Sequence, residues 1–112
     1  MPKSLAREVT HDVTYESNRD HWRNELRILR AQRATIEEGG GERAAERQRS
    51  QGKMLARERL EALIDPGSTF LELGTFAAWG MYEEWGGAPA AGVVVGIGQV
   101  SGRECVLVVN DA

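Results

Sequence analysis

Two apolar, β-rich runs near the end of the chain most restrict what it can fold into. Residues Val93–Val100 and Arg103–Val109 are rich in β-branched side chains, and Ser101-Gly102 between them is a short-turn signal. This pattern predicts a β-hairpin. Gly96 and Gly98 lie within the first run and predict either a bulge or the close approach of another backbone segment.

The second run is apolar at most positions, so it needs cover on both faces and neighbours along its edges. Only one further strand is predicted, at Thr69–Leu73, together with a few helices. A chain of 112 residues holds at most one ordinary domain, and small chains bury a small share of their surface. We therefore expect an incomplete, truncated domain.

A long amphipathic helix is predicted upstream of this hairpin. Ser17 or Asn18 can cap its start, and the glycine run Gly39–Gly41 ends it. Residues 1–16 before it are polar and predict a flexible or docking arm. The apolar face of the helix follows a helical spacing and consists of Trp22, Leu26, Leu29 and Ile36.

Two shorter helices are predicted next, at Glu42–Ser50 and at about Ala56–Ile64, with a break near Gln51-Gly52. Asp65–Ser68 has the composition of a turn, and Gly74–Gly92 that of a structured loop. The apolar side chains that we expect the second short helix to bury are Leu60, Leu63 and Ile64.

Bulk properties exclude several classes of protein. The longest apolar stretch, Ala88–Val95, is too short to cross a bilayer, and the start of the chain lacks the apolar run of a secretory signal, so we expect none. Cys105 is the single cysteine and is expected to be a small buried hydrophobe, while His11 and His21 lack a metal-binding context. With a net charge of −3 as well, we expect a cytoplasmic protein with no metal site, no nucleic-acid partner and no membrane contact.

A local cluster of cations departs from this acidic balance. Six basic side chains lie between Gly41 and Leu60 and are Arg43, Arg47, Arg49, Lys53, Arg57 and Arg59. Several recur at spacings of four, which places cations on one side of a helix. Such a cluster can bind phosphates through charge-assisted hydrogen bonds, or it can be a solvated helix face with internal salt bridges.

Three ordered blocks of sequence carry a family resemblance. Gln51–Leu60 followed by Leu63–Glu72 is similar to the pattern RGKL-x-x-RER-I-x-x-L-x-DPGS-x-F-x-E, and Gly92–Arg103 resembles G-V-V-x-G-x-G-x-V-x-G-R. Asn110–Ala112 is similar to the start of a following NDxT motif. All three patterns resemble those of the carboxyltransferase (beta) subunits of biotin-dependent acyl-CoA carboxylases, the methylcrotonoyl-CoA, geranyl-CoA and propionyl-CoA carboxylase family.

The resemblance extends from about Asn18 to the end of the chain. Leu55 and the Ser50–Lys53 context favour the methylcrotonoyl-CoA or geranyl-CoA branch over the propionyl-CoA branch. Ala88–Ala91 departs from the glycine-rich loop usual before the hairpin, and this departure leaves the substrate class open.

The resemblance implies a fold and a division into domains. The expected fold is α+β or α/β, with N-terminal helices and a β-hairpin that begin a truncated crotonase-like (ClpP/crotonase) ββα-superhelix domain. Residues 1–40 would form an N-terminal arm and amphipathic helix, and residues 41–112 an incomplete N-terminal, acyl-CoA-binding carboxyltransferase domain. Trp22 and Leu26 would pack against the body of the subunit or a partner.

The resemblance also implies a reaction. Family members move a carboxyl group to an acyl-CoA from carboxybiotin, which a separate biotin carboxylase or biotin carrier subunit supplies, and they form homo-oligomers. No covalently bound cofactor is expected. The glycine-rich oxyanion segments are expected beyond residue 112, so we assign no catalytic residue and expect the fragment alone to be inactive. Lys53 and Arg57 are the expected contacts with CoA phosphates, and Arg59 is expected in a structural ion pair.

Two other functions compete with this one. The chain could be a non-catalytic interaction or scaffold piece that docks on a full-length partner. It could also be a small basic-helix RNA-binding module, although it lacks an RNP or KH signature.

Overall fold

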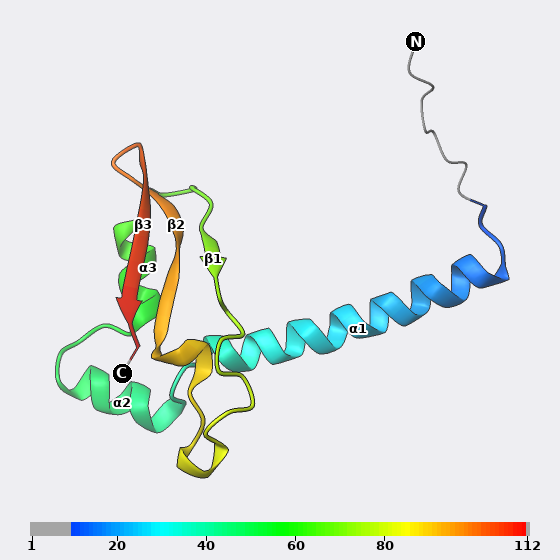
Figure 1. Ribbon diagram of the computed structural model, residues 1–112. Coiled ribbons are helices and arrows are strands. Elements are labelled where there is room, and N and C mark those ends of the chain that lie inside the picture. The colour runs from blue at the N-terminus through cyan, green and yellow to red at the C-terminus, as the bar shows by residue number, and fades with distance from the viewer. Residues whose placement is uncertain (1–9, 112) are drawn as a thin grey trace. The chain divides into compact units, whose positions relative to one another are not determined.

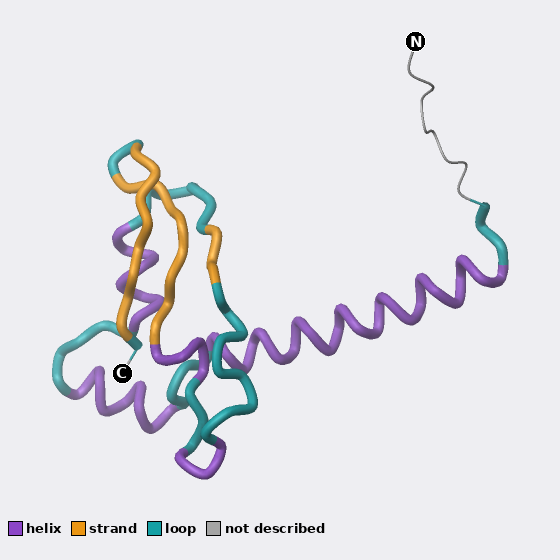
Figure 2. The backbone as a smooth tube through the Cα atoms, in the orientation of Figure 1, coloured by secondary structure: helices purple, strands orange, loops and turns teal. Residues whose placement is uncertain are grey.

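The computed structural model describes residues 10–111. Figure 1 shows the helices and strands, and Figure 2 shows the loops between them. Their bounds are α1 Val13–Glu37, α2 Glu42–Ser50, α3 Ala56–Leu63, β1 Leu71–Leu73, β2 Val93–Val100 and β3 Arg103–Asn110. Two short 3-10 turns, Glu83–Trp85 and Pro89–Gly92, interrupt the structured loop that was predicted before β2. The chain divides within α1, between Ala31 and Gln32, into two compact units, which are described separately.

In the N-terminal unit, α1 begins at Val13, so the prediction of a start near Ser17 or Asn18 was wrong. The reason is an earlier cap: Asp12 Oδ1 accepts a hydrogen bond of 2.8 Å from the backbone N–H of Tyr15. The end of the predicted arm is therefore helical. Its first nine residues lie outside the described part of the chain.

The apolar positions of α1 differ sharply in exposure. Trp22, Leu26 and Leu29 in the N-terminal unit are exposed by 64%, 44% and 46%. Ile36 belongs to the second unit and is buried. The helix ends at Glu37 as predicted, where Gly39 adopts a positive φ of 63° and donates its N–H to the Ile36 carbonyl at 3.0 Å.

In the second unit, β1, β2 and β3 form an antiparallel sheet in that order. The predicted hairpin is confirmed, with Ser101 and Gly102 both at positive φ in its turn. The pairing of β2 is uninterrupted along its whole length with β3 and over three residues with β1, so its glycines mark close approach and not a bulge. A Cβ atom at Gly96 would lie 2.3 Å from the Leu71 carbonyl oxygen and from Phe70 Cζ.

Helix α3 covers one face of the sheet, as Figure 1 shows. Its Ala56 and Leu60 pack with Val94 of β2 in a buried cluster. Half-buried apolar side chains surround this cluster and are Ile64, Phe70, Leu107 and Val109. Leu63 was expected to be buried but is 49% exposed, because Ala56, Leu60 and Ile64 follow one another at intervals of four and Leu63 lies beside that line.

The opposite face of the sheet is apolar, and no described segment of the second unit covers it. On this face, Ile97 of β2 lies between Leu71 of β1 and Val106 of β3. In the next row along the strands, Leu73 of β1 and Val108 of β3 lie on either side of β2. The exposed fractions on this face are 58% for Leu71, 47% for Leu73, 71% for Val106 and 65% for Val108. An apolar face of this extent is what a partial domain presents.

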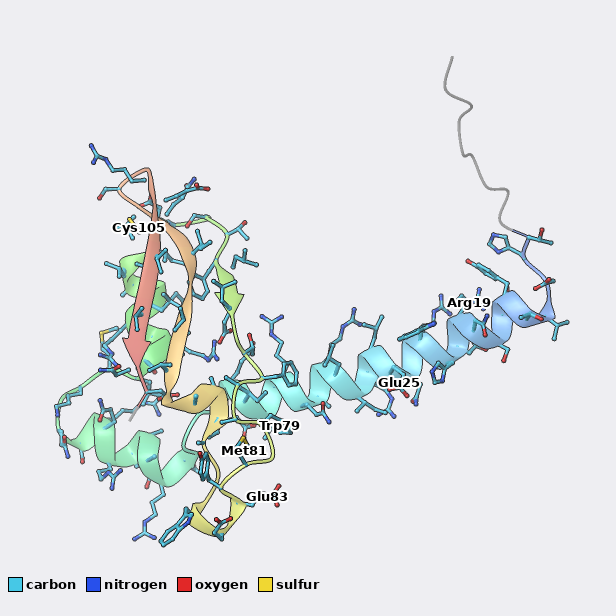
Figure 3. All side chains as sticks on the ribbon, viewed as in Figure 1. Arg19, Glu25, Trp79, Met81, Glu83 and Cys105 are labelled. Atoms are coloured by element: carbon cyan, nitrogen blue, oxygen red, sulfur yellow. The ribbon has the colours of Figure 1, made fainter. Side chains whose placement is uncertain are left out.

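Two smaller sequence expectations can be compared with the structure. Cys105 on β3 is half-buried, not buried, because it lies near the end of the hairpin (Figure 3). None of the helices within the described residues has the length and apolar character to span a membrane.

Candidate functional site

Lys53 lies on the loop that joins α2 to α3. Two backbone hydrogen bonds fold this loop back on the end of α2: Gly52 N–H donates to the Arg49 carbonyl at 2.9 Å, and Lys53 N–H donates to the Gln48 carbonyl at 3.2 Å. Gly52 adopts a positive φ of 71°, which a side chain would disfavour. The loop therefore holds the Lys53 backbone in place and leaves its side chain exposed.

Glu58 ties the same loop to the start of α3. Its Oε2 accepts the Leu55 backbone N–H at 2.9 Å, and its Oε1 accepts Arg49 Nη2 at 2.8 Å. The hydrogen bond from Arg49, and then that from Leu55, hold the pKa of the Glu58 carboxyl below its usual value. One carboxylate thus joins the last turn of α2 to the first turn of α3.

Arg57 makes a bidentate ion pair with Glu72 of β1. Its Nη1 and Nη2 donate to the two carboxylate oxygens at 3.0 and 2.9 Å. The Glu72 side chain is 5% exposed and that of Arg57 is 28% exposed, so the pair is largely shielded from water. The Glu72 hydrogen bonds raise the pKa of Arg57 against the opposing effect of burial. Arg57 therefore attaches α3 to the first strand.

Within residues 10–111, Arg59 makes no such ion pair with a carboxylate, contrary to its expected role. Its Nη2 donates to the Asn110 carbonyl at the end of β3, at 2.5 Å. The side chain is exposed and lines a surface pocket of about 310 Å³ together with Lys53. The other residues that line this pocket are Gln48, Gly52 and Met54.

The two predicted phosphate contacts line different pockets. Lys53 lines the pocket it shares with Arg59, whereas Arg57 lines a smaller one of about 80 Å³. Arg43 and Arg47 border a third hollow, of about 390 Å³, whose lining is completed by Gly40 and Ala44. The six-cation cluster of the sequence is thus divided among separate surfaces and ion pairs.

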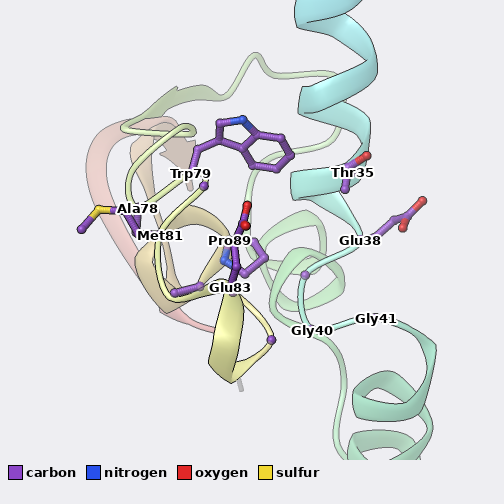
Figure 4. A pocket seen from close by; sticks show the side chains of 14 residues that line it. Thr35, Glu38, Gly40, Gly41, Ala78, Trp79, Met81, Glu83 and Pro89 are labelled. Atoms are coloured by element: carbon purple, nitrogen blue, oxygen red, sulfur yellow. The ribbon is translucent and has the colours of Figure 1, made fainter.

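A further pocket, of about 380 Å³, lies between the glycine-rich loop before β2 and the end of α1 with the glycine run that follows it, and it was not anticipated from the sequence (Figure 4). Its lining combines the Trp79 ring with the carboxylates Glu38 and Glu83 and contains no lysine or arginine. The aromatic and glycine content of this loop was the available signal. Because carboxylates repel phosphates, this pocket suits an apolar or cationic group.

The turn residue Asp65 has a more specific role than its motif predicted. Its Oδ1 accepts the Ser101 N–H and its Oδ2 accepts the Gly102 N–H, each at 2.7 Å. Its own N–H donates to the Gln99 carbonyl at 2.8 Å. The carboxylate therefore clamps the turn of the β2–β3 hairpin.

Comparison with known proteins agrees with these motifs. The family described as carboxyl transferase domain matches residues 47–112, the segment that contains α3 and the whole sheet. This chain belongs to the carboxyl transferase domain family. The match includes the loop of Lys53, the Arg57–Glu72 pair and the Asp65 clamp.

Two relatives of this carboxyl transferase chain are carboxylase subunits. It is 58% identical over 74 residues to the biotin-dependent 3-methylcrotonyl-coenzyme A carboxylase beta1 subunit of Mycobacterium tuberculosis. The aligned residues cover 66% of this chain and 14% of that subunit. It is 45% identical over 104 residues to the mitochondrial methylcrotonoyl-CoA carboxylase beta chain of Dictyostelium discoideum, 91% of this chain and 17% of that one.

Solved structures agree with this assignment. The beta subunit of Pseudomonas aeruginosa geranyl-CoA carboxylase matches with a TM-score of 0.73 at 26% identity, over 91% of this chain and 19% of that one. The transcarboxylase 12S hexamer with methylmalonyl-coenzyme A and methylmalonic acid bound matches with a TM-score of 0.67 at 44% identity, over 80% and 18%. This chain spans less than a fifth of the length of these four relatives.

Proposed function

We propose that this chain is the N-terminal segment of a carboxyltransferase subunit that transfers a carboxyl group from carboxybiotin to an acyl-CoA. The observation that carries the proposal is the family match over residues 47–112, which covers the whole sheet and every residue of the basic cluster except Arg43. The carboxybiotin would be carried by a separate biotin carboxylase or biotin carrier subunit, and the subunit would form a homo-oligomer.

A methylcrotonoyl-CoA-like substrate is the preferred acyl-CoA. The support comes from the two methylcrotonyl-CoA carboxylase relatives, at 58% and 45% identity, and from Leu55 and the loop context around Lys53. A propionyl-CoA carboxylase beta chain of Rattus norvegicus is also 44% identical over 70 residues, so the branches differ modestly in this segment.

The proposal includes the finer structural expectations. The helices and antiparallel sheet would begin a crotonase-like domain from about residue 41, preceded by the arm and amphipathic helix, in a cytoplasmic protein. The chain alone would be inactive, because the backbone N–H groups that stabilise an enolate oxyanion would be supplied by other segments.

Lys53 and Arg57 are the proposed contacts with the CoA phosphates. Lys53 is exposed on its loop. Arg57 gives two of its five N–H groups to Glu72 and keeps three for a ligand. Of the two, Lys53 has the greater freedom to approach a phosphate.

The test of this function measures binding and turnover separately. The ¹⁵N-labelled full chain is titrated with methylcrotonoyl-CoA and propionyl-CoA, and carboxyl transfer is assayed in the presence of carboxybiotin. We expect binding, with methylcrotonoyl-CoA the tighter ligand, and no turnover. Failure of both acyl-CoA thioesters to shift any resonance would contradict the proposed acyl-CoA platform, and turnover by the chain alone would contradict the expected inactivity.

The uncovered apolar sheet face favours one alternative, a non-catalytic piece that docks on a full-length partner. A complementation assay separates the two functions. The chain is combined with the mycobacterial beta1 subunit deleted for its matching segment. Restored carboxylation supports the enzyme segment, whereas association that leaves the deleted subunit inactive supports the docking piece.

A further inference from the structure

We propose that Arg59, together with Lys53, forms the phosphate-binding pocket of this chain, and that Arg57 acts as the residue that positions α3. This inference rests on the proposed function and names the residues of its CoA site. The second cation of the site is then Arg59, which lines the same pocket as Lys53, in place of Arg57, which is paired with Glu72.

The first support is the distribution of carboxylates around the basic cluster. Glu58 pairs with Arg49 and Glu72 pairs with Arg57, so two of the cations are already neutralised by protein groups. Neither Lys53 nor Arg59 forms an ion pair with any carboxylate of residues 10–111. These two cations keep their charge available for an external anion.

The second support is that the Arg59 guanidinium and the Lys53 backbone are held in place before a ligand arrives. Arg59 uses one N–H on the Asn110 carbonyl, which leaves four donors on a guanidinium whose position is set. Lys53 sits on a loop closed by the Gln48 and Arg49 carbonyls and by the Glu58 carboxylate. Preorganised donors lose less conformational entropy when they bind.

The third support is the lining of the pocket itself. It combines the two cations with the Gln48 side chain and with Met54, which is 47% exposed. A diphosphate needs the charges, and the thioether offers an apolar surface to the organic part of a nucleotide. The Arg43–Arg47 hollow has no such apolar side chain larger than alanine, and the Trp79 pocket is lined by carboxylates.

The experiment titrates the full chain, labelled with ¹⁵N, with CoA, dephospho-CoA and inorganic pyrophosphate. Variants Lys53→Gln and Arg59→Gln each remove one positive charge, and Arg47→Gln removes the same charge from the neighbouring hollow as the matched control. We expect each of the first two variants to weaken CoA and pyrophosphate binding about tenfold, which corresponds to one charge-assisted hydrogen bond. Arg47→Gln should change binding less than twofold.

Arg57→Gln separates a binding role from a positioning role. We expect it to lower the urea midpoint of the chain while the folded fraction binds pyrophosphate as tightly as the original, and we expect Arg59→Lys to retain most of the binding. A tenfold loss in Arg57→Gln with none in Arg59→Gln would overturn the inference and leave the Lys53–Arg57 assignment of the proposed function standing.

The remaining outcomes also decide between the two proposals. If the Lys53, Arg59 and Arg47 variants weaken CoA binding equally, the effect reflects net charge alone. That result would overturn the assignment of the phosphate site to the Lys53–Arg59 pocket. Binding of pyrophosphate but not CoA, lost in both pocket variants, would support the pocket and contradict the proposed acyl-CoA function. Absence of binding by all three probes would overturn both.

Discussion

At the scale of single residues, charged side chains here connect segments that are distant in sequence. Asp65 bonds the hairpin turn 36 positions later, and Arg57 bonds Glu72 15 positions later. Arg59 reaches the Asn110 carbonyl 51 positions away. Each of these contacts joins the α3 region to the sheet, so polar side chains supplement a small buried cluster in holding the second unit together.

Replacement of Asp65 by alanine is expected to destabilise the chain by about 1–3 kcal/mol, because two charge-assisted hydrogen bonds to backbone N–H groups are lost. Asp65→Asn keeps one acceptor and should lose about half as much. Urea unfolding followed by circular dichroism measures both. Glu61→Ala on exposed α3 surface is the control, and equal midpoints for Asp65→Ala and this control would show that the clamp contributes nothing.

At the scale of elements, one carboxylate connects the two helices of the α2–loop–α3 segment. Glu58 joins Arg49 at the end of α2 to the Leu55 N–H at the start of α3. The loop between them carries Lys53, which lines the proposed anion pocket, so we expect the shape of that pocket to respond to the ionisation of Glu58.

Acidification is expected to loosen this loop. The pKa of Glu58 is lowered in the folded chain, mainly by Arg49 and then by Leu55. A lowered folded pKa means that the stabilisation is present above the unfolded value of about 4.3 and is lost as the pH falls through the folded value. An NMR titration of the Glu58 carboxyl and the Gly52 amide measures this.

The variant Arg49→Gln provides the control for that titration. It removes the larger cause of the shift, so the Glu58 pKa should move up towards its ordinary value and the Gly52 amide should respond at higher pH. An unchanged Glu58 titration in this variant would show that Arg49 does not hold the carboxylate.

At the scale of the whole molecule, the second unit has one covered and one uncovered sheet face. Helix α3 covers the face of Val94, Leu107 and Val109. The other face exposes apolar side chains of β1 and β3, including Val106 and Val108. This asymmetry is consistent with a chain that matches less than a fifth of its relatives.

The uncovered face is expected to make the isolated chain associate with itself and bind hydrophobic dyes, since large exposed apolar patches do both. Val106→Lys combined with Val108→Thr should reduce dye fluorescence and shift sedimentation towards the monomer without lowering the urea midpoint. Val94→Thr, on the buried side, should instead lower the midpoint. Unchanged sedimentation in the double variant would show that this face does not drive association.

Local patterns in the sequence were sufficient to predict most of the elements. The glycine run ended α1, the break at Gln51-Gly52 separated α2 from α3, and Ser101-Gly102 formed the hairpin turn. These features depend on backbone conformations and hydrogen bonds within a few residues, which the order of side chains determines directly. The family assignment followed from the same blocks of residues.

Contacts between distant segments were decided only by the tertiary structure. Spacing along a helix placed Arg57 and Arg59 among the same basic residues, but it carried no information about Glu72 or the Asn110 carbonyl. The exposure of Leu63 and the hydrogen bonds from the hairpin turn to Asp65 likewise depend on how distant segments pack. Which cation is neutralised and which stays available depends on the partners that packing brings to it, because electrostatic and hydrogen-bonding energies depend on distance in space and not along the chain.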